Sequence, residues 1–312
     1  MTTEKTFKTL SALTEKEMLK ALPKMLRKVG YNPVATNEYI YAEGDIPIAL
    51  CAHMDIVSAE PPTNLFYDND KNVIWAGGHI LGADDRAGIT AIWEIIKHKD
   101  YKPHLIFTTG EETGAAGAHA LAIHGNPFQE LKFIIELDRA NSNDCVFYDC
   151  DNPQFEEYIN SFGFETEYGT FTDISILCPS WKVAGVNLSV GYYFEHTKYE
   201  HLKFNELEET IKRVMRILSD EDSKSYEYIP AIGMLSYYQF ECSFCGKRKG
   251  YPELHDILLP SGLSALACNS CMRQHKRIHK CKICNEYFYA NNGNETICYD
   301  CDTGVNNGQR TY

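Results

Sequence analysis

The stretch Thr109-Gly-Glu-Glu-Thr-Gly114 decides how the rest of the chain is interpreted. It follows residues 104–108, an apolar and β-branched run that is typical of a buried strand. It precedes the alanine-rich run 115–122, which predicts a helix because alanine has the highest helix propensity. Glu111 and Glu112 therefore lie on a loop between a strand end and a helix start, where neighbouring side chains point in different directions. On its own, such a pair of acids is most often a helix cap that the helix dipole favours.

Short apolar segments and amphipathic segments alternate along the first 218 residues. Apolar and β-branched runs predict strands, and apolar residues at helical spacing predict helices. The predicted strands are 37–42, 46–52, 104–108, 131–137, 145–148 and 182–189, and the predicted helices are 12–29, 86–99, 115–122, 153–162 and 205–218. We expect a hairpin-like turn at residues 43–45 and a kink or break at Pro23. The alternation predicts an α/β domain with a largely parallel central sheet.

Acidic and histidine side chains stand at many of the predicted strand ends and helix starts. They are His53, Asp84, Glu111, Glu112, Asp138 and His196. Each alone has a structural explanation, such as a turn, a helix cap or a surface position. In an α/β sheet, however, ligands bind beyond the carboxyl ends of the strands. We therefore expect these side chains to meet along one edge of the sheet.

Four segments carry a resemblance to a known group of enzymes. They are Ala52-His-Met-Asp55, Leu81-Gly-Ala-Asp-Asp-Arg-Ala-Gly88, Thr109-Gly-Glu-Glu-Thr-Gly114 and Asn187-Leu-Ser-Val-Gly-Tyr-Tyr-Phe-Glu-His-Thr-Lys-Tyr-Glu200. With Asp138 between the last two, their order resembles the co-catalytic zinc exopeptidases. This clan holds the M28 aminopeptidases, the M42 aminopeptidases and the M20 group that includes peptidase T. The resemblance covers about residues 40–218 and implies a three-layer, phosphorylase/hydrolase-like domain with a mostly parallel central sheet.

The resemblance also implies which residues hold metal. Carried over by position, His53 and Asp138 bind one catalytic zinc ion, and Glu112 and His196 bind the other. Asp84 bridges the two ions, and the peptide bond that follows it is often cis in this family. Mixed histidine and carboxylate ligands suit Zn²⁺, with Co²⁺ and Mn²⁺ as the alternative catalytic metals.

Two further residues have implied roles that do not involve metal ligation. Asp55 lies two positions after His53, on the same face of the strand, where its carboxylate can hold the imidazole in one tautomer. Glu111 is the implied general base, which takes a proton from a water shared by the two metals and passes it to the leaving amine. His201 is a rival ligand five residues after His196, but only His196 stands in the His-Thr-x-x-Glu context of the family.

The spacing of the site residues distinguishes subfamilies within the clan. M20 enzymes insert a lid domain before the final histidine, but only 57 residues separate Asp138 from His196 here. M42 enzymes insert a domain before the bridging aspartate, but only 30 residues separate His53 from Asp84. Both intervals are too short for such an insertion. The chain therefore resembles the lid-free, M28-like architecture.

Eight of the 12 cysteines lie after residue 241, in four Cys-x-x-Cys pairs. The pairs are Cys242 with Cys245, Cys268 with Cys271, Cys281 with Cys284, and Cys298 with Cys301. Four such pairs within about 60 residues are typical of two structural zinc sites with four cysteine ligands each, as in a zinc ribbon. We favour sequential sites, the first pair with the second and the third with the fourth, and a cross-brace is the alternative. Because so short a segment has little apolar core, zinc should supply much of its folding energy.

Charge separates this cysteine-rich tail from the rest of the chain. Residues 241–312 carry a formal charge of +2 before thiolates are counted, whereas the remainder carries −15. We place a catalytic domain without a lid insertion at 1–225 and a C-terminal domain with two four-cysteine zinc sites at 226–312. Basic and aromatic residues such as Lys247-Arg-Lys249 and Tyr287-Phe-Tyr289 would suit nucleic acid. With eight thiolates and two zinc ions the tail becomes net negative, so a contact with a protein is at least as well supported.

Composition limits where the protein works. The chain of 312 residues has a net charge of −13, which disfavours anionic membranes and nucleic acid as partners of the whole molecule. It has no apolar run of about 18 residues, so we expect no membrane-spanning helix. Its first residues lack the apolar core of a signal peptide. We therefore expect a cytoplasmic protein whose cysteines are reduced or bound to metal.

These features predict a dinuclear zinc hydrolase that cleaves an amide bond, with an aminopeptidase acting on a peptide as the first hypothesis. One alternative is an amidohydrolase or deacylase that acts on a small, non-peptide amide. A second alternative is a catalytically idle binding protein with a peptidase fold. The presence of all seven site positions argues against loss of activity.

Overall fold

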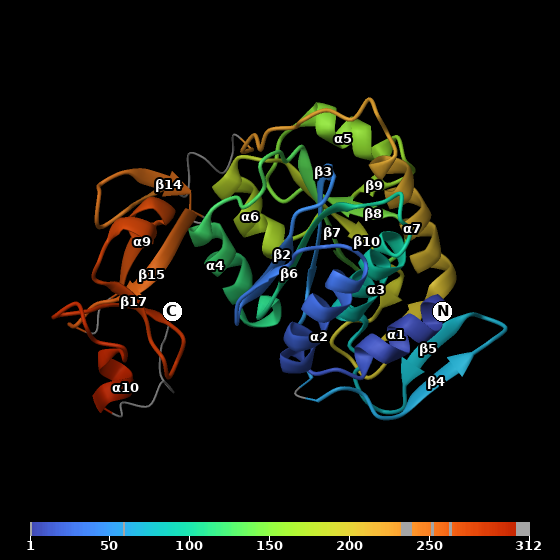
Figure 1. Ribbon diagram of the computed structural model, residues 1–312, viewed down its shortest axis with the longest axis horizontal. Coiled ribbons are helices and arrows are strands. Elements are labelled where there is room, and N and C mark those ends of the chain that lie inside the picture. Colours follow the sequence, from blue (N-terminus) through green and yellow to red (C-terminus); the bar gives the residue numbers. More distant parts are fainter. Residues whose placement is uncertain (1, 59, 232–238, 251–252, 262–263, 304–312) are drawn as a thin grey trace. The chain divides into compact units, whose positions relative to one another are not determined.

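The computed structural model describes residues 2–58, 60–231, 239–250, 253–261 and 264–303 (Figure 1). The chain forms two compact units. Unit 1 comprises Met1–Leu121 and Gly125–Ala231, and unit 2 comprises Ala122–His124 and Ile232–Tyr312. None of the helices in the described ranges is both long and apolar enough to span a membrane.

A sheet of eight strands forms the centre of unit 1. In spatial order the strands are β1 (Val34–Ala35), β2 (Tyr39–Ala42), β6 (Pro103–Thr108), β3 (Ile46–His53), β7 (Phe133–Arg139), β10 (Gly185–Ser189), β8 (Asp144–Val146) and β9 (Glu165–Thr166). The four central strands β6, β3, β7 and β10 run parallel to one another. The predicted α/β fold with a mostly parallel central sheet is confirmed.

The hairpin predicted between β2 and β3 is wrong, because β6 lies between these two strands in the sheet. β2 pairs with β6 antiparallel, and β3 pairs with β6 parallel, so that Thr108 is opposite Tyr39 on one side and His53 on the other. Residues 43–45 therefore connect two strands that are not neighbours. There Gly44 passes so close to β6 that a Cβ atom would lie 2.2 Å from the Lys102 carbonyl oxygen.

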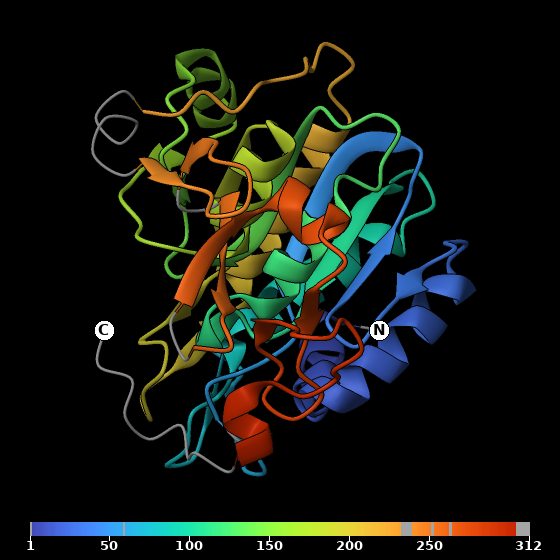
Figure 2. The same ribbon diagram turned by 90° about the vertical axis from the view of Figure 1, so that its left-hand side faces the viewer.

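Helices cover both faces of the sheet, as Figures 1 and 2 show. α3 (Ala83–Ile96), α7 (Phe204–Leu218) and α1 (Thr3–Ser11) pack together on one face, whereas α4 (Ala116–His124) and α6 (Asp173–Trp181) lie on the other. α5 (Pro153–Asn160) adds Phe155 to the aromatic packing around Phe133 of β7. The structure therefore has the three layers, helix–sheet–helix, that the sequence predicts.

The break predicted at Pro23 does not occur. α2 (Glu15–Lys28) runs through Pro23, and it begins at the capping box of Thr14 and Glu17. Its buried face, which includes Met18 and Leu22, packs into the core of unit 1. Proline removes one backbone hydrogen bond from a helix, and the packing of this face offsets that loss.

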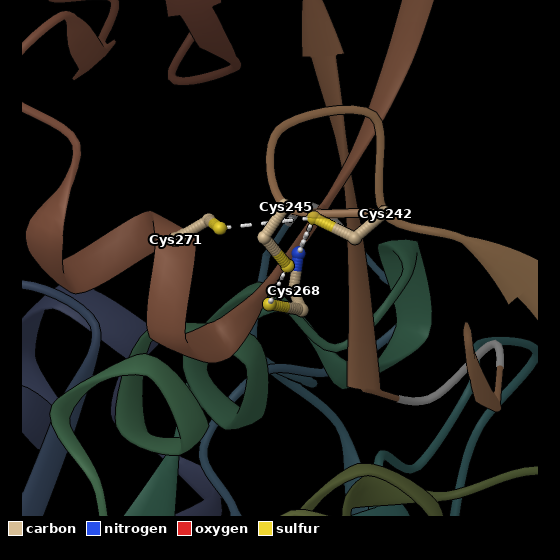
Figure 3. Close-up of side chains that lie close together, drawn as sticks. All are labelled: Cys242, Cys245, Cys268 and Cys271. Carbon is tan, nitrogen blue, oxygen red and sulfur yellow. Dashed lines mark hydrogen bonds between the residues drawn. The ribbon is translucent and has the colours of Figure 1, made fainter. Parts of the chain in front are cut away.

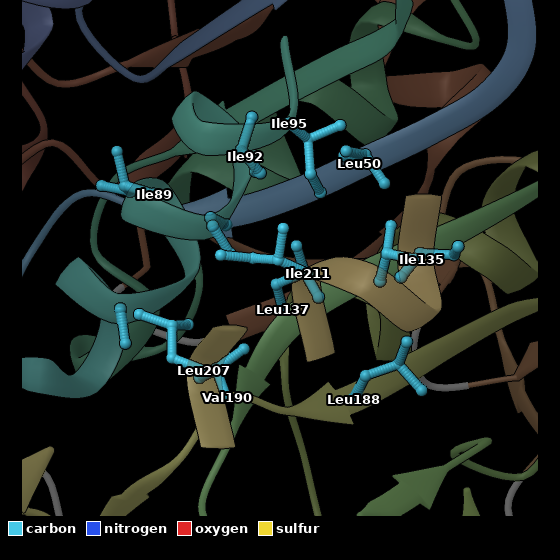
Figure 4. Packing of buried hydrophobic residues seen from close by; sticks show 14 of the residues in the cluster. Leu50, Ile89, Ile92, Ile95, Ile135, Leu137, Leu188, Val190, Leu207 and Ile211 are labelled. Atoms are coloured by element: carbon cyan, nitrogen blue, oxygen red, sulfur yellow. The ribbon is translucent and has the colours of Figure 1, made fainter. Parts of the chain in front are cut away.

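The core lies between the sheet and the α3–α7 layer, as Figure 4 shows. Leu50, Ile135 and Leu188 point from β3, β7 and β10 towards the helices. Ile92 of α3 and Leu207 of α7 pack against them. Alternate residues on a strand point to opposite faces, so the neighbours of these strand residues point towards the α6 side.

Two smaller sets of strands complete the fold. In unit 1, β11 (Tyr192–Tyr193), β12 (His201–Lys203), β5 (Val73–Ala76) and β4 (Leu65–Asp68) form an antiparallel sheet. In unit 2, β13 (Gln239–Glu241) pairs with β14 (Arg248–Gly250), and β16 (Ser264–Cys268), β15 (Leu254–Leu258), β18 (Tyr287–Tyr289) and β17 (Ile278–Lys280) form a second sheet. Two short helices, α9 (Asn269–Gln274) and α10 (Tyr299–Thr303), follow cysteine positions.

Gly88 allows α3 to pack closely against the end of β7. A Cβ atom at this position would lie 1.9 Å from the Leu137 carbonyl oxygen and 2.4 Å from Asp85 Oδ1. We expect Gly88→Ala to lower the free energy of unfolding by about 3 kcal/mol, as overpacking of a rigid core does, measured by urea denaturation. A glycine-to-alanine change in a helix without such contacts stabilises it by up to about 1 kcal/mol. A more stable variant would therefore contradict the packing described.

Candidate metal centre

The structure brings the predicted site residues together at one edge of the large sheet. His53 ends β3, and Asp138 is the last residue but one of β7. Asp84 stands in the non-helical start of α3, next to a cis peptide bond to Asp85. The remaining members stand on loops: Glu111 and Glu112 in the short helix η1 (Glu111–Thr113), Asp55 after β3, and His196 after β11. Segments far apart in the sequence thus supply one cluster.

One group of potential ligands consists of His53, Asp84 and Asp138. His53 Nε2 lies 3.0 Å from Asp84 Oδ1 and 3.4 Å from Asp138 Oδ1. The His53 side chain is fully buried. Burial and the nearby Asp84 carboxylate raise the pKa of Asp138 to about 7.

A second group consists of Asp84, Glu112 and His196. His196 Nε2 lies 3.0 Å from Asp84 Oδ2 and 2.9 Å from Glu112 Oε1. Contacts with these two carboxylates raise the pKa of His196 to about 10. The two oxygens of Asp84 therefore face different histidines, as a carboxylate that bridges two cations must.

Asp55 connects the first histidine to the Glu-Glu loop. Its Oδ1 lies 3.3 Å from His53 Nδ1, whereas the other ring nitrogen of His53 faces Asp84. The backbone N–H groups of Glu111 and Glu112 each donate to Asp55, at 3.1 Å. The Asp55 carboxylate thus orients the imidazole and holds the loop that carries both glutamates.

The Glu111 carboxylate belongs to neither group of potential ligands. Burial, followed by the Asp138 carboxylate, raises its pKa to about 9. Divalent cations beside it would act in the opposite direction and lower this pKa. A carboxylate next to the ligands but free of them can accept a proton from a reacting group.

Two carboxylates outside the predicted set of ligands and base hold Asp84 and His53 in place. Glu200 is buried and accepts the backbone N–H groups of Gly82, Ala83 and Asp84, at 2.8, 2.8 and 3.2 Å. Asp85 accepts the backbone N–H of His53 at 3.2 Å. The signal for Glu200 was its place at the end of the His-Thr-x-x-Glu motif. Nothing in the sequence indicated that it reaches the start of α3.

Asp138 is held by neighbouring strands and by the start of α6. The Asn187 side chain accepts the Asp138 N–H at 2.9 Å and donates to the Asp138 carbonyl oxygen at 3.0 Å. The Thr172 hydroxyl donates to Asp138 Oδ2 at 3.2 Å, and the Tyr192 hydroxyl lies 3.4 Å from Asp138 Oδ1. These bonds limit the positions that the carboxylate can adopt.

His201 lies outside this cluster. It is on β12, where Nδ1 contacts the Tyr199 carbonyl oxygen at 3.1 Å and the ring stacks on Tyr193. Of the two histidines that compete for the last ligand position, the structure brings only His196 to Asp84.

The donor set of the cluster fits two zinc ions. Each group offers one imidazole nitrogen and carboxylate oxygens, which Zn²⁺ accepts as ligands. Several buried carboxylates lie close together, and no lysine or arginine of the described chain forms an ion pair with Asp84, Glu112 or Asp138. Burying anions without cations is costly, so divalent ions between these groups would offset that cost.

The tail cysteines form two groups of four. The first group is Cys242, Cys245, Cys268 and Cys271, shown in Figure 3, and the second is Cys281, Cys284, Cys298 and Cys301. In the first group the sulfur atoms of Cys242 and Cys271 lie 3.7 Å apart, and those of Cys245 and Cys268 lie 3.8 Å apart. The grouping is sequential, and the cross-brace arrangement is not the one found.

Backbone N–H groups prepare one cysteine of each group to bind metal. Burial acts to raise the pKa of Cys242, but hydrogen bonds from backbone N–H groups, that of Cys268 foremost, lower it to about 6. The same balance lowers the pKa of Cys281 to about 6, where the N–H groups of Cys284 and Cys298 donate. Thiolates are the form of cysteine that binds zinc.

Solved structures with the same fold are described as aminopeptidases and related peptidases. Aminopeptidase PepT from Bacillus cereus is 16% identical, with a TM-score of 0.58, over 69% of this chain and 97% of that chain. A tripeptidase from Staphylococcus aureus is 15% identical, with a TM-score of 0.56, over 69% and 96%. An aminopeptidase from the archaeon Desulfurococcus kamchatkensis is 11% identical, with a TM-score of 0.53, over 70% and 94%. At such low identity these likenesses establish the fold.

The sequence model of peptidase family M28 matches residues 37–167. This segment contains all of the predicted metal-centre residues except His196. No curated protein matches the sequence. The match to this family model confirms the predicted resemblance to the zinc exopeptidases and, with it, the prediction of a metallo-hydrolase.

Glu200 provides a test of how the bridging carboxylate is held. We expect Glu200→Gln to lower the affinity for zinc about 10–100-fold, because an amide cannot accept all three backbone N–H groups that fix the start of α3. Titration against a competing chelator measures the affinity. Glu195→Gln is the matched control, since Glu195 lies on the same loop but is exposed. Unchanged affinity in Glu200→Gln would show that these hydrogen bonds do not position Asp84.

Proposed function

We propose that the protein is a dinuclear zinc aminopeptidase, in which His53 and Asp138 hold one ion, Glu112 and His196 hold the other, and Asp84 bridges them. The observation that carries the proposal is the division of the two Asp84 oxygens between the two histidines. The match to peptidase family M28 supports it. Aminopeptidase and tripeptidase activities are those named for the structural relatives. Co²⁺ and Mn²⁺ are alternative occupants of the same ligands.

Zinc, when bound, supplies a Lewis acid that polarises the scissile carbonyl group and lowers the pKa of water. The protein's residues handle the protons. Glu111 accepts a proton from the attacking water and transfers it to the leaving amine nitrogen. The Asp55 carboxylate, 3.3 Å from His53 Nδ1, favours the tautomer that is protonated there, which leaves the Nε2 lone pair free to bind a metal ion.

The charge around the site favours a substrate with a free amino terminus. The site carries the carboxylates of Asp55, Asp84, Glu111, Glu112 and Asp138, and two divalent ions reduce their formal charge from −5 to −1. A protonated substrate amine is attracted to such a site, and a substrate carboxylate is repelled. An amidohydrolase that acts on a neutral acyl amide is the second candidate, because the same ligands and base would serve it.

We propose further that residues 1–225 form the catalytic domain without a lid insertion. In the described chain, the interval between Asp138 and His196 contributes β8, β9 and β10 to the large sheet of unit 1. Residues 226–312 would form a zinc-ribbon-like domain with one structural zinc ion in each four-cysteine group. Its net negative charge with zinc bound favours a contact with a protein over one with nucleic acid. We propose a cytoplasmic location, because a reducing compartment keeps cysteines as thiols or zinc-bound thiolates, the form that the two four-cysteine groups require.

Because Glu111 and Glu112 are adjacent but have different proposed roles, single substitutions can distinguish the general base from a metal ligand. We expect Glu111→Gln to retain two zinc ions in the metal centre and lose about 10²–10⁴-fold in kcat, because general base catalysis contributes about that much. Glu112→Gln should instead lose one ion together with activity. Metal analysis and steady-state kinetics measure both variants. Near-normal turnover by Glu111→Gln would refute its role as the base.

Substrates that differ in charge at the amino terminus can distinguish the aminopeptidase from the amidohydrolase. We expect hydrolysis of aminoacyl amides with a free α-amine and at least about tenfold lower kcat/KM for the same amides after N-acetylation. Acetylation removes the positive charge and with it the attraction to the acidic site, and a tenfold loss corresponds to about 1.4 kcal/mol. Equal or faster cleavage of the acetylated amides would favour the amidohydrolase.

A further inference from the structure

A second set of potential ligands lies beneath the metal centre. It consists of Cys51, Glu136 and Asp173, whose side chains are all fully buried. The Cys51 sulfur and one carboxylate oxygen from each acid lie within 4.8 Å of one another. The proposed function uses none of the three.

The strand register explains why two of these residues meet. Cys51 precedes His53 by two residues on β3, and Glu136 precedes Asp138 by two residues on β7. The parallel pairing of β3 and β7 places Cys51 directly opposite Glu136. Residues two apart share a face of a strand and are about 6.6 Å apart along it. Cys51 and Glu136 therefore form a second row below His53 and Asp138 on the same face.

Asp173 belongs to α6, in the helix layer beside the sheet, and its carboxylate lies next to Cys51 and Glu136. It lies in the first turn of α6, and α6 packs against β7 and β10. The Thr108 hydroxyl donates a hydrogen bond to Asp173 Oδ2. The neighbouring Thr172 hydroxyl is directed at Asp138, in the upper row. The group of three thus joins two strands and one helix.

Polar atoms of this group lack partners. Within the described residues, no donor meets hydrogen-bond geometry at either carboxylate oxygen of Glu136, although the Thr172 hydroxyl lies near it, and Asp173 Oδ1 also has no partner. No lysine, arginine or histidine of the described chain forms an ion pair with either acid. Buried polar atoms in proteins nearly always have a partner, and an exception calls for an explanation such as a bound ion. Two buried acids and a thiol that face one another without such partners indicate a place for a cation.

We propose that Cys51, Glu136 and Asp173 bind a third zinc ion in unit 1. A thiolate ligand selects zinc over magnesium or calcium, and two carboxylate oxygens complete a set of three protein donors. The thiol loses its proton when the metal binds. The ion would supply the missing partner of Glu136 and Asp173. It would also tie β3, β7 and α6 together directly below the residues that hold the catalytic ions.

Zinc content tests this site. The full-length protein and the variants Cys51→Ala, Glu136→Gln and Cys178→Ala are purified alike, and zinc per chain is measured by plasma mass spectrometry. Cys178 is the control because it is also a buried thiol, on α6, but it belongs to none of the ligand groups found in the described residues. We expect Cys51→Ala and Glu136→Gln each to lose one equivalent of zinc and Cys178→Ala to lose none. Wild-type zinc content in both of the first two variants would overturn the proposal.

A second measurement uses the unsubstituted protein, so its result does not depend on whether a variant folds. In the full-length protein loaded with ¹¹³Cd, the chemical shift of each cadmium ion reports how many sulfur ligands it has. We expect a resonance for a single-sulfur site, between those of the four-cysteine sites and those of the oxygen- and nitrogen-only sites of the metal centre. Its absence, with the resonances of the other sites present, would mean that the three groups are protonated and hold no metal. Because the catalytic ions have no sulfur ligand, failure of this proposal is distinct from failure of the proposed function.

Discussion

The structure of unit 1 depends on one electrostatic constraint, the burial of several carboxylates around Asp84 without enough positive side chains to balance them. The two oxygens of Asp84 face His53 and His196, and the carboxylates of Asp138 and Glu112 complete the two groups. Keeping so many anions together in a low dielectric is costly unless cations are present. The two divalent ions proposed for the site would satisfy the constraint, and the surrounding hydrogen bonds would then hold the ligands in place.

The supporting bonds show how the fold places chemistry at the sheet edge. Asp55 orients His53 and also receives the N–H groups of the Glu-Glu loop. Glu200, from a distant loop, holds the start of α3 and therefore the position of Asp84. The proposed ligands are thus fixed by neighbours on other elements, so that metal binding and the packing of unit 1 would support one another.

Much of this could be predicted from the sequence, because local periodicity and motif order carry the information. The elements with a clear apolar pattern, such as β6 and α7, lie where they were predicted, and the residue types at the strand ends indicated the metal centre. Strand pairing could not be predicted, since β6 enters between β2 and β3 through contacts distant in sequence. The helix α6 was missed, because Pro179 interrupts its pattern. The group of Cys51, Glu136 and Asp173 was missed for the same reason as the pairing, since it depends on the register of β3 and β7.

A crystal structure of the zinc-loaded protein, with anomalous data collected at the zinc edge, tests the dinuclear centre most directly. A dinuclear centre predicts two anomalous peaks on either side of Asp84, about 3.5–4 Å apart, one beside His53 and the other beside His196. No peak, or a single peak that leaves one of these two histidines without metal, would contradict a dinuclear centre.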